Sequence, residues 1–249
     1  MEVEYAIETH NLVKNYLKGT VKAVRGIDLK VRKGEIYAFI GANGSGKSTT
    51  IDIISGVLRP TSGRVKVLGL DIPKERRKLS QLIGVAPQEY SIYLDLSVWE
   101  NISFFGRLYG MSKQEIEDEG SRLLKILKLE EKRDTTCEHL SGGMKRRVSI
   151  ACALIHSPEL ILFDEATVGV DPILRAYFWD FFKSLRNEGK TILVTSHVMD
   201  EAEKADRIGL MREGRLIEEG TPSELLQRHQ VKNVEELFIK LSGDGTNEN

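Results

Sequence analysis

The sequence predicts an α/β fold, and two features of the chain support this prediction. Short, wholly apolar runs, of the kind that form buried parallel strands, alternate with longer segments of helical periodicity. One such run, residues 36–40, leads into a glycine-rich loop at 41–48, after which apolar residues return at helical spacing. The order of strand, glycine loop and helix is typical of a phosphate-binding site in an α/β protein.

The loop has the pattern G-x-x-x-x-G-K-[ST], and its residues are Gly41, Ala42, Asn43, Gly44, Ser45, Gly46, Lys47 and Ser48, followed by Thr49. Glycines allow consecutive backbone N–H groups to turn toward one point and form a cradle for an anion. Lys47 supplies a mobile positive charge for the β- and γ-phosphates of a nucleotide, and the Ser48 hydroxyl can ligate Mg²⁺. The N-terminus of the helix that follows also favours phosphate.

Composition and charge limit the class of protein. The chain has 249 residues, 41% of them hydrophobic, which suits one large α/β domain or a domain with an inserted subdomain. Its 36 basic and 37 acidic residues give no electrostatic reason to expect nucleic acid or anionic lipid as a main partner. No apolar run approaches the ~18–20 residues of a membrane span, and the first residues do not resemble a secretory signal. Cys137 and Cys152 lack metal-ligand spacing, and we expect a reduced, cytosolic setting.

Around the loop, the pattern predicts an antiparallel β subdomain. Residues 5–14 and 21–31 alternate between apolar and polar side chains, as half-exposed antiparallel strands do. Residues 64–68 and 82–86 predict two more strands, and residues 74–80 predict a short basic helix with a solvated face.

Helical patterns dominate the middle of the chain. Capping boxes at Ser97 and Ser112 open two predicted helices, and a third begins near Ser141. Because all three lie between predicted strands, we expect an inserted α-helical subdomain at about 89–157. Beyond it, the expected elements are a buried strand at 160–163, a helix from Asp171, a buried strand at 191–195, a hairpin at 207–219 and two helices after Thr221.

Two of the later strands end in side chains that suit phosphate chemistry. Asp164 ends an apolar strand, which is the arrangement that holds Mg²⁺ opposite a phosphate loop, directly or through water. Glu165 follows at once, and a carboxylate there can polarise an attacking water. His197 follows the next strand and could bond a γ-phosphate, although a histidine at such a position is also common as a structural residue.

A second anion cradle is predicted at Leu140-Ser141-Gly142-Gly143-Met144, where a helix begins. One nucleotide does not need two cradles, so a second protomer would explain it; a plain helix cap at Ser141 is the alternative. Upstream, Tyr16 could stack on a purine ring or could simply pack at a strand end.

Taken together, these motifs resemble the nucleotide-binding subunit of ABC (ATP-binding cassette) transporters, over about residues 5–220 and in the order of that family. Residues 41–48 match the Walker A loop, and residues 160–165 match the Walker B strand with its catalytic glutamate. Residues 140–144 match the LSGG signature, and Gln88 matches the Q-loop glutamine. Asp171 matches the D-loop aspartate, His197 matches the switch histidine, and Tyr16 matches the adenine-stacking aromatic. The resemblance implies a P-loop NTPase core of the ABC ATPase type at 1–220, followed by a helical tail at 221–249.

The resemblance also implies a mechanism and a set of partners. ATP and Mg²⁺ are the expected cofactors, with Ser48, Gln88 and Asp164 at the metal and with Lys47, Glu165 and His197 in catalysis. The family forms head-to-tail dimers, here of one or two kinds of chain, in which the LSGG segment of one protomer completes the ATP site of the other. Hydrolysis drives a membrane-spanning permease, so the chain is expected to be peripheral, at the cytoplasmic face of the cell membrane, with no nucleic acid partner.

Several positions bear on the branch and on the rate. Met144 in place of the usual glutamine, the Arg146-Arg147 pair and the tail at 234–238 resemble the ABC-2 type exporter branch. Ala166 replaces the usual proline after the catalytic glutamate, which is expected to loosen the turn, and Val168 stands where a small polar residue is usual. Neither change removes a ligand, so they bear on turnover rate rather than on activity itself.

Three other functions fit the sequence less well. A soluble ABC ATPase acting on ribosomes or in DNA repair commonly has two cassettes, a long coiled coil or a zinc insert, and this chain has none of these. A non-catalytic regulatory module would not need Lys47, Glu165 and His197. A GTPase would carry an [NT]-K-x-D motif, which is missing. The cargo is not encoded here, because the permease selects it.

Six of the 17 aromatic residues fall between Tyr90 and Tyr109. On a helix from Val98, the residues Val98, Ile102, Phe105 and Tyr109 form one stripe, which we assign to the core of the helical subdomain. The remaining aromatics are Tyr90, Tyr93, Trp99 and Phe104. Either they also pack internally, or they form a partly exposed aromatic groove that receives a short coupling helix of the permease.

Overall fold

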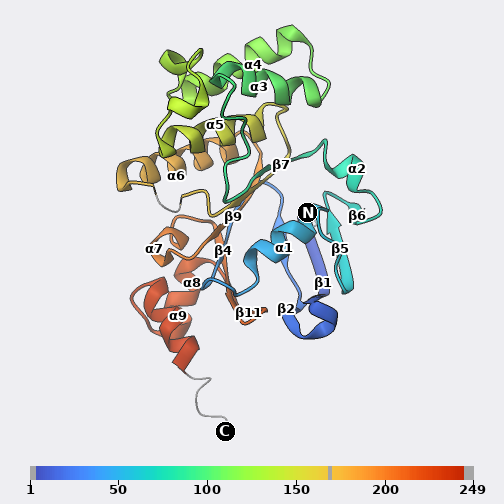
Figure 1. Cartoon of the computed structure of the whole chain (residues 1–249). Helices are drawn as coiled ribbons and strands as arrows, with labels where there is room; N and C mark the ends of the chain where they lie inside the picture. Colours follow the sequence, from blue (N-terminus) through green and yellow to red (C-terminus); the bar gives the residue numbers. More distant parts are fainter. Residues whose placement is uncertain (1–3, 168–169, 244–249) are drawn as a thin grey trace.

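The computed structural model describes residues 4–167 and 170–243 (Figure 1), and its centre is a mainly parallel sheet. The strands of this sheet, in spatial order, are β11 (Arg215–Gly220), β10 (Arg207–Arg212), β4 (Ile36–Ile40), β9 (Thr191–Ser196), β8 (Leu160–Asp164) and β7 (Ile83–Ala86). All neighbouring pairs run parallel except β10 and β11. Parallel strands place their carboxyl ends at one edge, so the segments after β4, β7, β8 and β9 meet there.

A second, antiparallel sheet forms the predicted β subdomain. It contains β2 (Val21–Ile27), β1 (Tyr5–Tyr16), β5 (Ser62–Val67) and β6 (Leu70–Ile72) in that order, with β3 (Lys30–Arg32) also paired to β1. The predicted strand at 21–31 is therefore two strands. The Thr9 hydroxyl accounts for the break, because it donates to the Ile27 carbonyl and accepts from the Leu29 N–H, replacing ladder bonds there.

Two hydrophobic clusters fill the space on the two faces of the parallel sheet. Successive side chains of strand β4 point to opposite faces of the sheet, so Ile36, Ala38 and Ile40 belong to one cluster, and Tyr37 and Phe39 belong to the other. The second cluster includes the antiparallel sheet and helix α1 (Lys47–Ile54). All five β4 residues are fully buried, and this close packing holds the start of the phosphate loop in place.

The helical part predicted between the strands contains α3 (Val98–Leu108), α4 (Lys113–Ile126) and α5 (Gly142–Leu154), with short 3₁₀ turns at Glu130–Lys132 and Cys137–His139. Figure 1 shows these helices gathered at one end of the molecule. Both predicted capping boxes are present, because Ser97 and Glu100, and likewise Ser112 and Glu115, exchange side-chain to backbone bonds. Ser141 caps α5 by accepting from the Met144 N–H.

The remaining helices complete the fold. They are α2 (Arg76–Leu79), shorter than predicted, α6 (Pro172–Asn187), α7 (Met199–Ala202), α8 (Pro222–His229) and α9 (Val234–Gly243), together with a 3₁₀ turn at Leu17–Gly19. The tail helices join the core, since Leu225, Val234 and Leu237 are buried in the cluster that contains Ile36. Within the described residues, no helix is both long enough and apolar enough to cross a membrane.

Candidate active site

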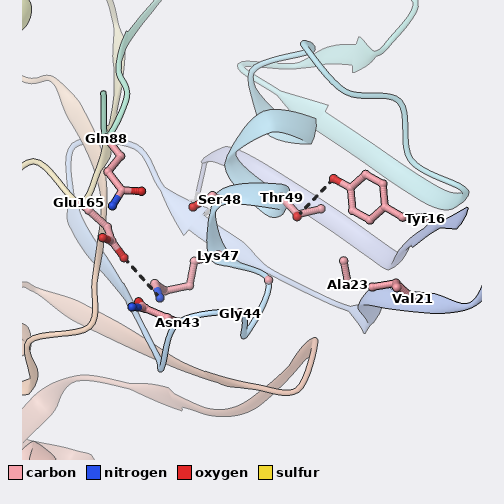
Figure 2. A pocket seen from close by; sticks show the side chains of 11 residues that line it. Tyr16, Val21, Ala23, Asn43, Gly44, Lys47, Ser48, Thr49, Gln88 and Glu165 are labelled. Atoms are coloured by element: carbon pink, nitrogen blue, oxygen red, sulfur yellow. Dashed lines mark hydrogen bonds and ion pairs between the residues drawn. The ribbon is translucent and has the colours of Figure 1, made fainter. Parts of the chain in front are cut away.

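A cavity of about 400 Å³ lies where α1 begins, between the two sheets (Figure 2). The phosphate loop forms its floor from Asn43 to Thr49, without Ser45. Tyr16 lies at one end of the cavity, and Gln88 and Glu165 lie at the other. The segments that follow β4, β7 and β8 thus contribute to one site, as the strand order requires.

The backbone of the loop needs glycine at particular positions. Gly44 and Gly46 have φ angles of 78° and 104°, in the left-handed region that other residues avoid. A Cβ at Gly46 would also lie 2.3 Å from the Ala23 carbonyl oxygen, and one at Gly41 would lie 2.3 Å from that of Met211. Gly46 precedes α1 and offers no side-chain cap, so the first N–H groups of the helix have no side-chain acceptor there. A phosphate group fits this need.

Lys47 is buried in the loop, where two backbone carbonyls and one carboxylate lie near its ammonium group. Its Nζ donates to the carbonyls of Gly41 (2.8 Å) and Ala42 (3.1 Å) and lies 3.8 Å from Glu165 Oε1. Figure 2 shows the lysine and the glutamate pointing toward each other. Burial lowers the pKa of Lys47, and the nearby Glu165 and Asp164 carboxylates oppose this. The cation is held by neutral carbonyls, which a phosphate can replace as stronger acceptors.

The two acidic residues after β8 are held in different ways. Asp164 Oδ1 accepts from Ser48 Oγ at 3.2 Å and also from the hydroxyl of Thr195. Glu165 has φ of 52°, an uncommon value for a residue other than glycine, and its N–H lies 3.0 Å from Thr195 Oγ1. Its Oε1 faces His197 Nδ1 at 3.3 Å. The strained turn therefore aims Glu165 at both Lys47 and His197.

The donors near Ser48 suit Mg²⁺. The Ser48 hydroxyl and the Asp164 carboxylate adjoin one another, and Gln88 lines the same cavity, so three hard oxygen donors lie at one edge. In the described part of the chain, no group of three or more His, Cys, Asp or Glu residues could hold a metal by itself. Mg²⁺ is commonly bound by one or two protein carboxylates together with water and phosphate oxygens, so this donor set fits the ion bound with a nucleotide.

Comparison with known proteins decides the family. The family model described as "ABC transporter" matches residues 24–168, which is more than half of the chain. The chain belongs to the ABC transporter family. Its fold is that of the family's ATPase cassettes, as predicted.

Two curated relatives cover nearly the whole chain. The linearmycin resistance ATP-binding protein LnrL of Bacillus subtilis is 40% identical over 97% of this chain and 76% of its own length. The Nod factor export ATP-binding protein I of Rhizobium meliloti is 40% identical over 94% of this chain and 69% of its own length.

Two solved structures have the same fold. The ATP-binding subunit of an ABC transporter has a TM-score of 0.86 and 27% identity, over 95% of this chain and 99% of its own. An ATP-binding cassette solved as a dimer in a post-hydrolysis state, bound to ADP and Pi, has a TM-score of 0.79 and 28% identity, over 86% of this chain and 98% of its own. ABC ATP-binding subunits hydrolyse ATP, dimerise and pair with membrane permeases.

Some of the predicted site residues do not line the cavity of a single chain. The LSGG residues Ser141, Gly142 and Gly143 lie at the start of α5, and Asp171 caps α6 by accepting from two N–H groups at 3.0 Å. A Cβ on Gly143 would lie 2.9 Å from Leu174 on α6, so the two helix N-termini adjoin. They form a second surface, separate from the nucleotide cavity, as a head-to-tail arrangement would need.

Tyr16 lies at the open end of the cavity. Its side chain is exposed, and its hydroxyl lies 3.4 Å from Thr49 Oγ1. The ring therefore lies at the cavity wall, with Lys14 Nζ 5.3 Å from its centroid, and its stacking on a purine stays a prediction. Of the family departures, Ala166 is fully buried beside Glu165, and Val168 lies outside the described residues. The expected loosening by Ala166 stays a prediction.

Several residues that position the site were missed in the sequence. Thr195 supports both acidic residues, as described above. Glu201 on α7 is 1% exposed, and its carboxylate accepts from Thr167 Oγ1 (2.5 Å) and Ser196 Oγ (3.2 Å), with Arg175 Nε 3.2 Å away. It thus links the turn after Glu165 to the strand end that carries His197. Its position in an acidic run gives no hint of burial.

Arg146 resembles the exporter branch in the sequence, but its contacts with the segment around Gln88 were not predicted. It is 6% exposed, and its guanidinium donates to the carbonyls of Pro87 and Gln88. Burial lowers its pKa, against the opposing effect of Tyr90 and Asp164. The arginine joins the LSGG helix α5 directly to the backbone of the Q-loop glutamine, so the two segments move together or break these bonds.

The aromatic cluster of α3 divides into two groups. Val98 and Ile102 are buried as predicted, while Phe105 and Tyr109 are partly buried and line a second cavity of about 200 Å³. Tyr109 stacks on His156, with ring centroids 3.6 Å apart.

The other aromatics are mostly exposed. Tyr90, Tyr93 and Phe104 are 45%, 48% and 40% exposed, so full internal packing is wrong for these three. Tyr93 and Phe104 form an edge-to-face pair with centroids 5.0 Å apart. Trp99 differs, since the Arg133 guanidinium lies 3.6 Å from its ring centroid and Gly120 packs beneath it. The name aromatic groove is used below for a set that differs from the predicted one: the second cavity, with Phe105 and Tyr109, together with the exposed Tyr93 and Phe104, and without Tyr90 and Trp99.

Proposed function

We propose that this chain is the ATP-binding and ATP-hydrolysing subunit of an exporter and that it acts through a separate membrane-spanning permease. The observation that carries the proposal is the convergence on one cavity of a phosphate loop, a buried lysine and a carboxylate aimed by a strained turn. The two relatives named for export and for drug resistance support the direction of transport. The cargo class is left to the permease.

The residues of the cavity have distinct roles in this proposal. Lys47 moves from the carbonyls of Gly41 and Ala42 to the phosphate oxygens of ATP. Glu165 takes the proton of the attacking water as general base, and His197, which Glu165 orients at 3.3 Å, donates to the γ-phosphate. Mg²⁺, when bound with the nucleotide beside Ser48, Gln88 and Asp164, neutralises charge on the phosphate oxygens.

Tyr16 stacks on the adenine in this proposal, and its exposed place at the cavity end supports that role. The surface with Ser141, Gly143 and Asp171 completes the site of a second protomer, in a homodimer or heterodimer. The N-terminus of α5 supports this, because the glycines that begin it present backbone N–H groups to an anion outside the chain's own cavity, while the N–H groups of the adjoining α6 are already capped by Asp171.

The permease contact is assigned to the aromatic groove, at the cytoplasmic face of the membrane. Phe105 and Tyr109 line the cavity there, beside the exposed pair of Tyr93 and Phe104. Gln88 precedes these residues in the chain, and Arg146 links its carbonyl to the LSGG helix. Ser149, Cys152 and Ala153 of the same helix line the groove, so a change at the nucleotide is passed to it through Gln88, Arg146 and α5.

The proposal is tested by coexpressing this chain with a candidate permease. The intact chain is expected to co-purify with the permease and to hydrolyse ATP, and a Glu165→Gln variant is expected to co-purify and bind ATP without hydrolysing it. An intact chain that hydrolyses ATP but does not co-purify with the permease would contradict the transport role, and no ATP binding at all would contradict the site.

A further inference from the structure

A strongly basic hollow surrounds helix α2 and shares no lining residue with the nucleotide cavity. It has a volume of about 640 Å³, and the basic side chains that line it are those of Arg59, Lys74, Arg76, Arg77 and Lys78. One acidic residue, Glu75, also lines it. The sequence predicted only a solvated basic helix here. The structure adds Arg59 from the segment after α1, so the charges converge from two parts of the chain. This site is called the basic hollow below.

Most of these charges lack an acidic neighbour. Lys78 Nζ pairs with Glu75 Oε1 at 2.9 Å, which uses the one carboxylate in the hollow. Over residues 4–167 and 170–243, no carboxylate forms an ion pair with Arg59, Lys74, Arg76 or Arg77, and all four residues are exposed. Four positive charges therefore face solvent together. At physiological salt, charges beyond about 8–10 Å are largely screened, so the net charge of −1 for the whole chain does not cancel this local field.

The hollow adjoins the aromatic groove. Val57 lines the groove and Arg59, two residues later, lines the hollow; likewise Lys78 lines the hollow and Ser80 lines the groove. Figure 1 shows α2 on the side of the molecule away from the tail helices α8 and α9. A permease seated in the groove would thus have the basic hollow at its border, on the face that the membrane covers.

Resting on the function proposed above, we propose that the basic hollow binds anionic lipid headgroups at the membrane surface beside the permease. Clustered lysines and arginines are attracted to anionic leaflets, each contributing about fivefold to the partition coefficient when it is close to the surface. The open form of the hollow and its exposed side chains suit a diffuse layer of phosphate groups. A single bound anion would instead call for a closed pocket with buried polar partners.

Vesicle flotation tests this proposal with the intact chain and no permease. Vesicles of phosphatidylcholine are compared with vesicles that also contain phosphatidylglycerol, at low and at physiological salt. The variant is Arg76→Glu with Arg77→Glu, and acidic side chains are favourable in the first turn of a helix. The matched control is Lys183→Glu with Lys232→Glu, which makes the same change of charge at exposed residues of α6 and of the segment before α9.

We expect the parent chain to float with the anionic vesicles only, and less so as salt rises. The Arg76/Arg77 variant should lose about 25-fold or more in partitioning, from about fivefold per residue, while the control keeps most of it. ATP affinity should be unchanged in both variants. A loss of ATP affinity would count against the proposed function and not against the lipid contact. Equal flotation of variant and control, or no preference for anionic vesicles, would overturn the proposal. So would a variant that floats normally but no longer co-purifies with the permease, since the partner would then be an acidic protein segment.

Discussion

Replacing Lys47 by alanine separates nucleotide affinity from fold stability. The lysine donates two hydrogen bonds to neutral carbonyls in the free chain, at 2.8 and 3.1 Å. With ATP bound, those donors would face charged phosphate oxygens, and hydrogen bonds to charged groups are worth about 1.5–3 kcal/mol each. Two such bonds give about 3–6 kcal/mol. At 1.4 kcal/mol for each factor of ten, ATP affinity should fall at least about a hundredfold.

The fold itself should tolerate this change. Burial lowers the pKa of Lys47, which means that the folded chain holds the charged form at a cost. The variant loses two charge-assisted hydrogen bonds and leaves Glu165, 3.8 Å away, without its cation, but it also removes this desolvated charge. Because these effects oppose each other, we expect the free energy of unfolding to fall by about 3 kcal/mol or less.

Titration with a fluorescent ATP analogue measures the affinity, and urea unfolding measures the stability. Lys190→Ala is the matched control: its Nζ also donates two hydrogen bonds, to Ser157, but it precedes β9, at the opposite edge of the sheet from the phosphate loop. The control should bind ATP as the parent does. An affinity equal to the parent's in Lys47→Ala would refute the assignment of residues 41–48 as the phosphate site.

Three further predictions follow from other parts of the molecule. Glu165→Gln keeps the shape of the side chain but removes the base, so with ATP it should form a stable dimer by light scattering; a chain that stays monomeric would count against the dimer. Tyr93→Asp with Phe104→Asp should leave ATP binding and folding intact, because both side chains are exposed, but should abolish co-purification with the permease; loss of folding would show that they belong to the core. Burial lowers the pKa of His156, so below pH 6.5 the unfolded chain takes up a proton that the folded chain refuses, and stability is lost as pH falls. His156→Phe keeps the stack on Tyr109 and should reduce the fall in the free energy of unfolding between pH 7 and 5, as measured by urea unfolding. An unchanged fall would show that another group causes the acid sensitivity.

The sequence predicted the fold class and the residues of the phosphate site because both depend on short-range patterns. The buried strands appear as apolar runs, and the glycine positions of the loop follow from local backbone geometry. Strand order was not predictable in this way, since β4 lies between the consecutive strands β9 and β10 although it is far from both in the chain. The break between β2 and β3 depends on Thr9, about 20 residues upstream, which no local pattern reveals.

The supporting residues were missed for the same reason. Thr195 is the next-to-last residue of an apolar strand, and its contact with Asp164 exists only because β8 and β9 are neighbours. Glu201 lies in an acidic, polar segment, yet α7 turns it inward against Thr167. Trp99 was considered for the aromatic groove, but Arg133 from a later loop covers it. Contacts across long sequence separations decide all three cases.

The most direct test of the account is phosphate release from ATP by the purified chain in the presence of Mg²⁺. We predict steady hydrolysis by the parent chain and at least a hundredfold slower release by Glu165→Gln, about the effect of removing a general base. Fluorescent ATP titration of the same samples should show that both chains bind nucleotide. Equal rates of phosphate release in the two chains would contradict the role given to Glu165 and with it the proposed mechanism.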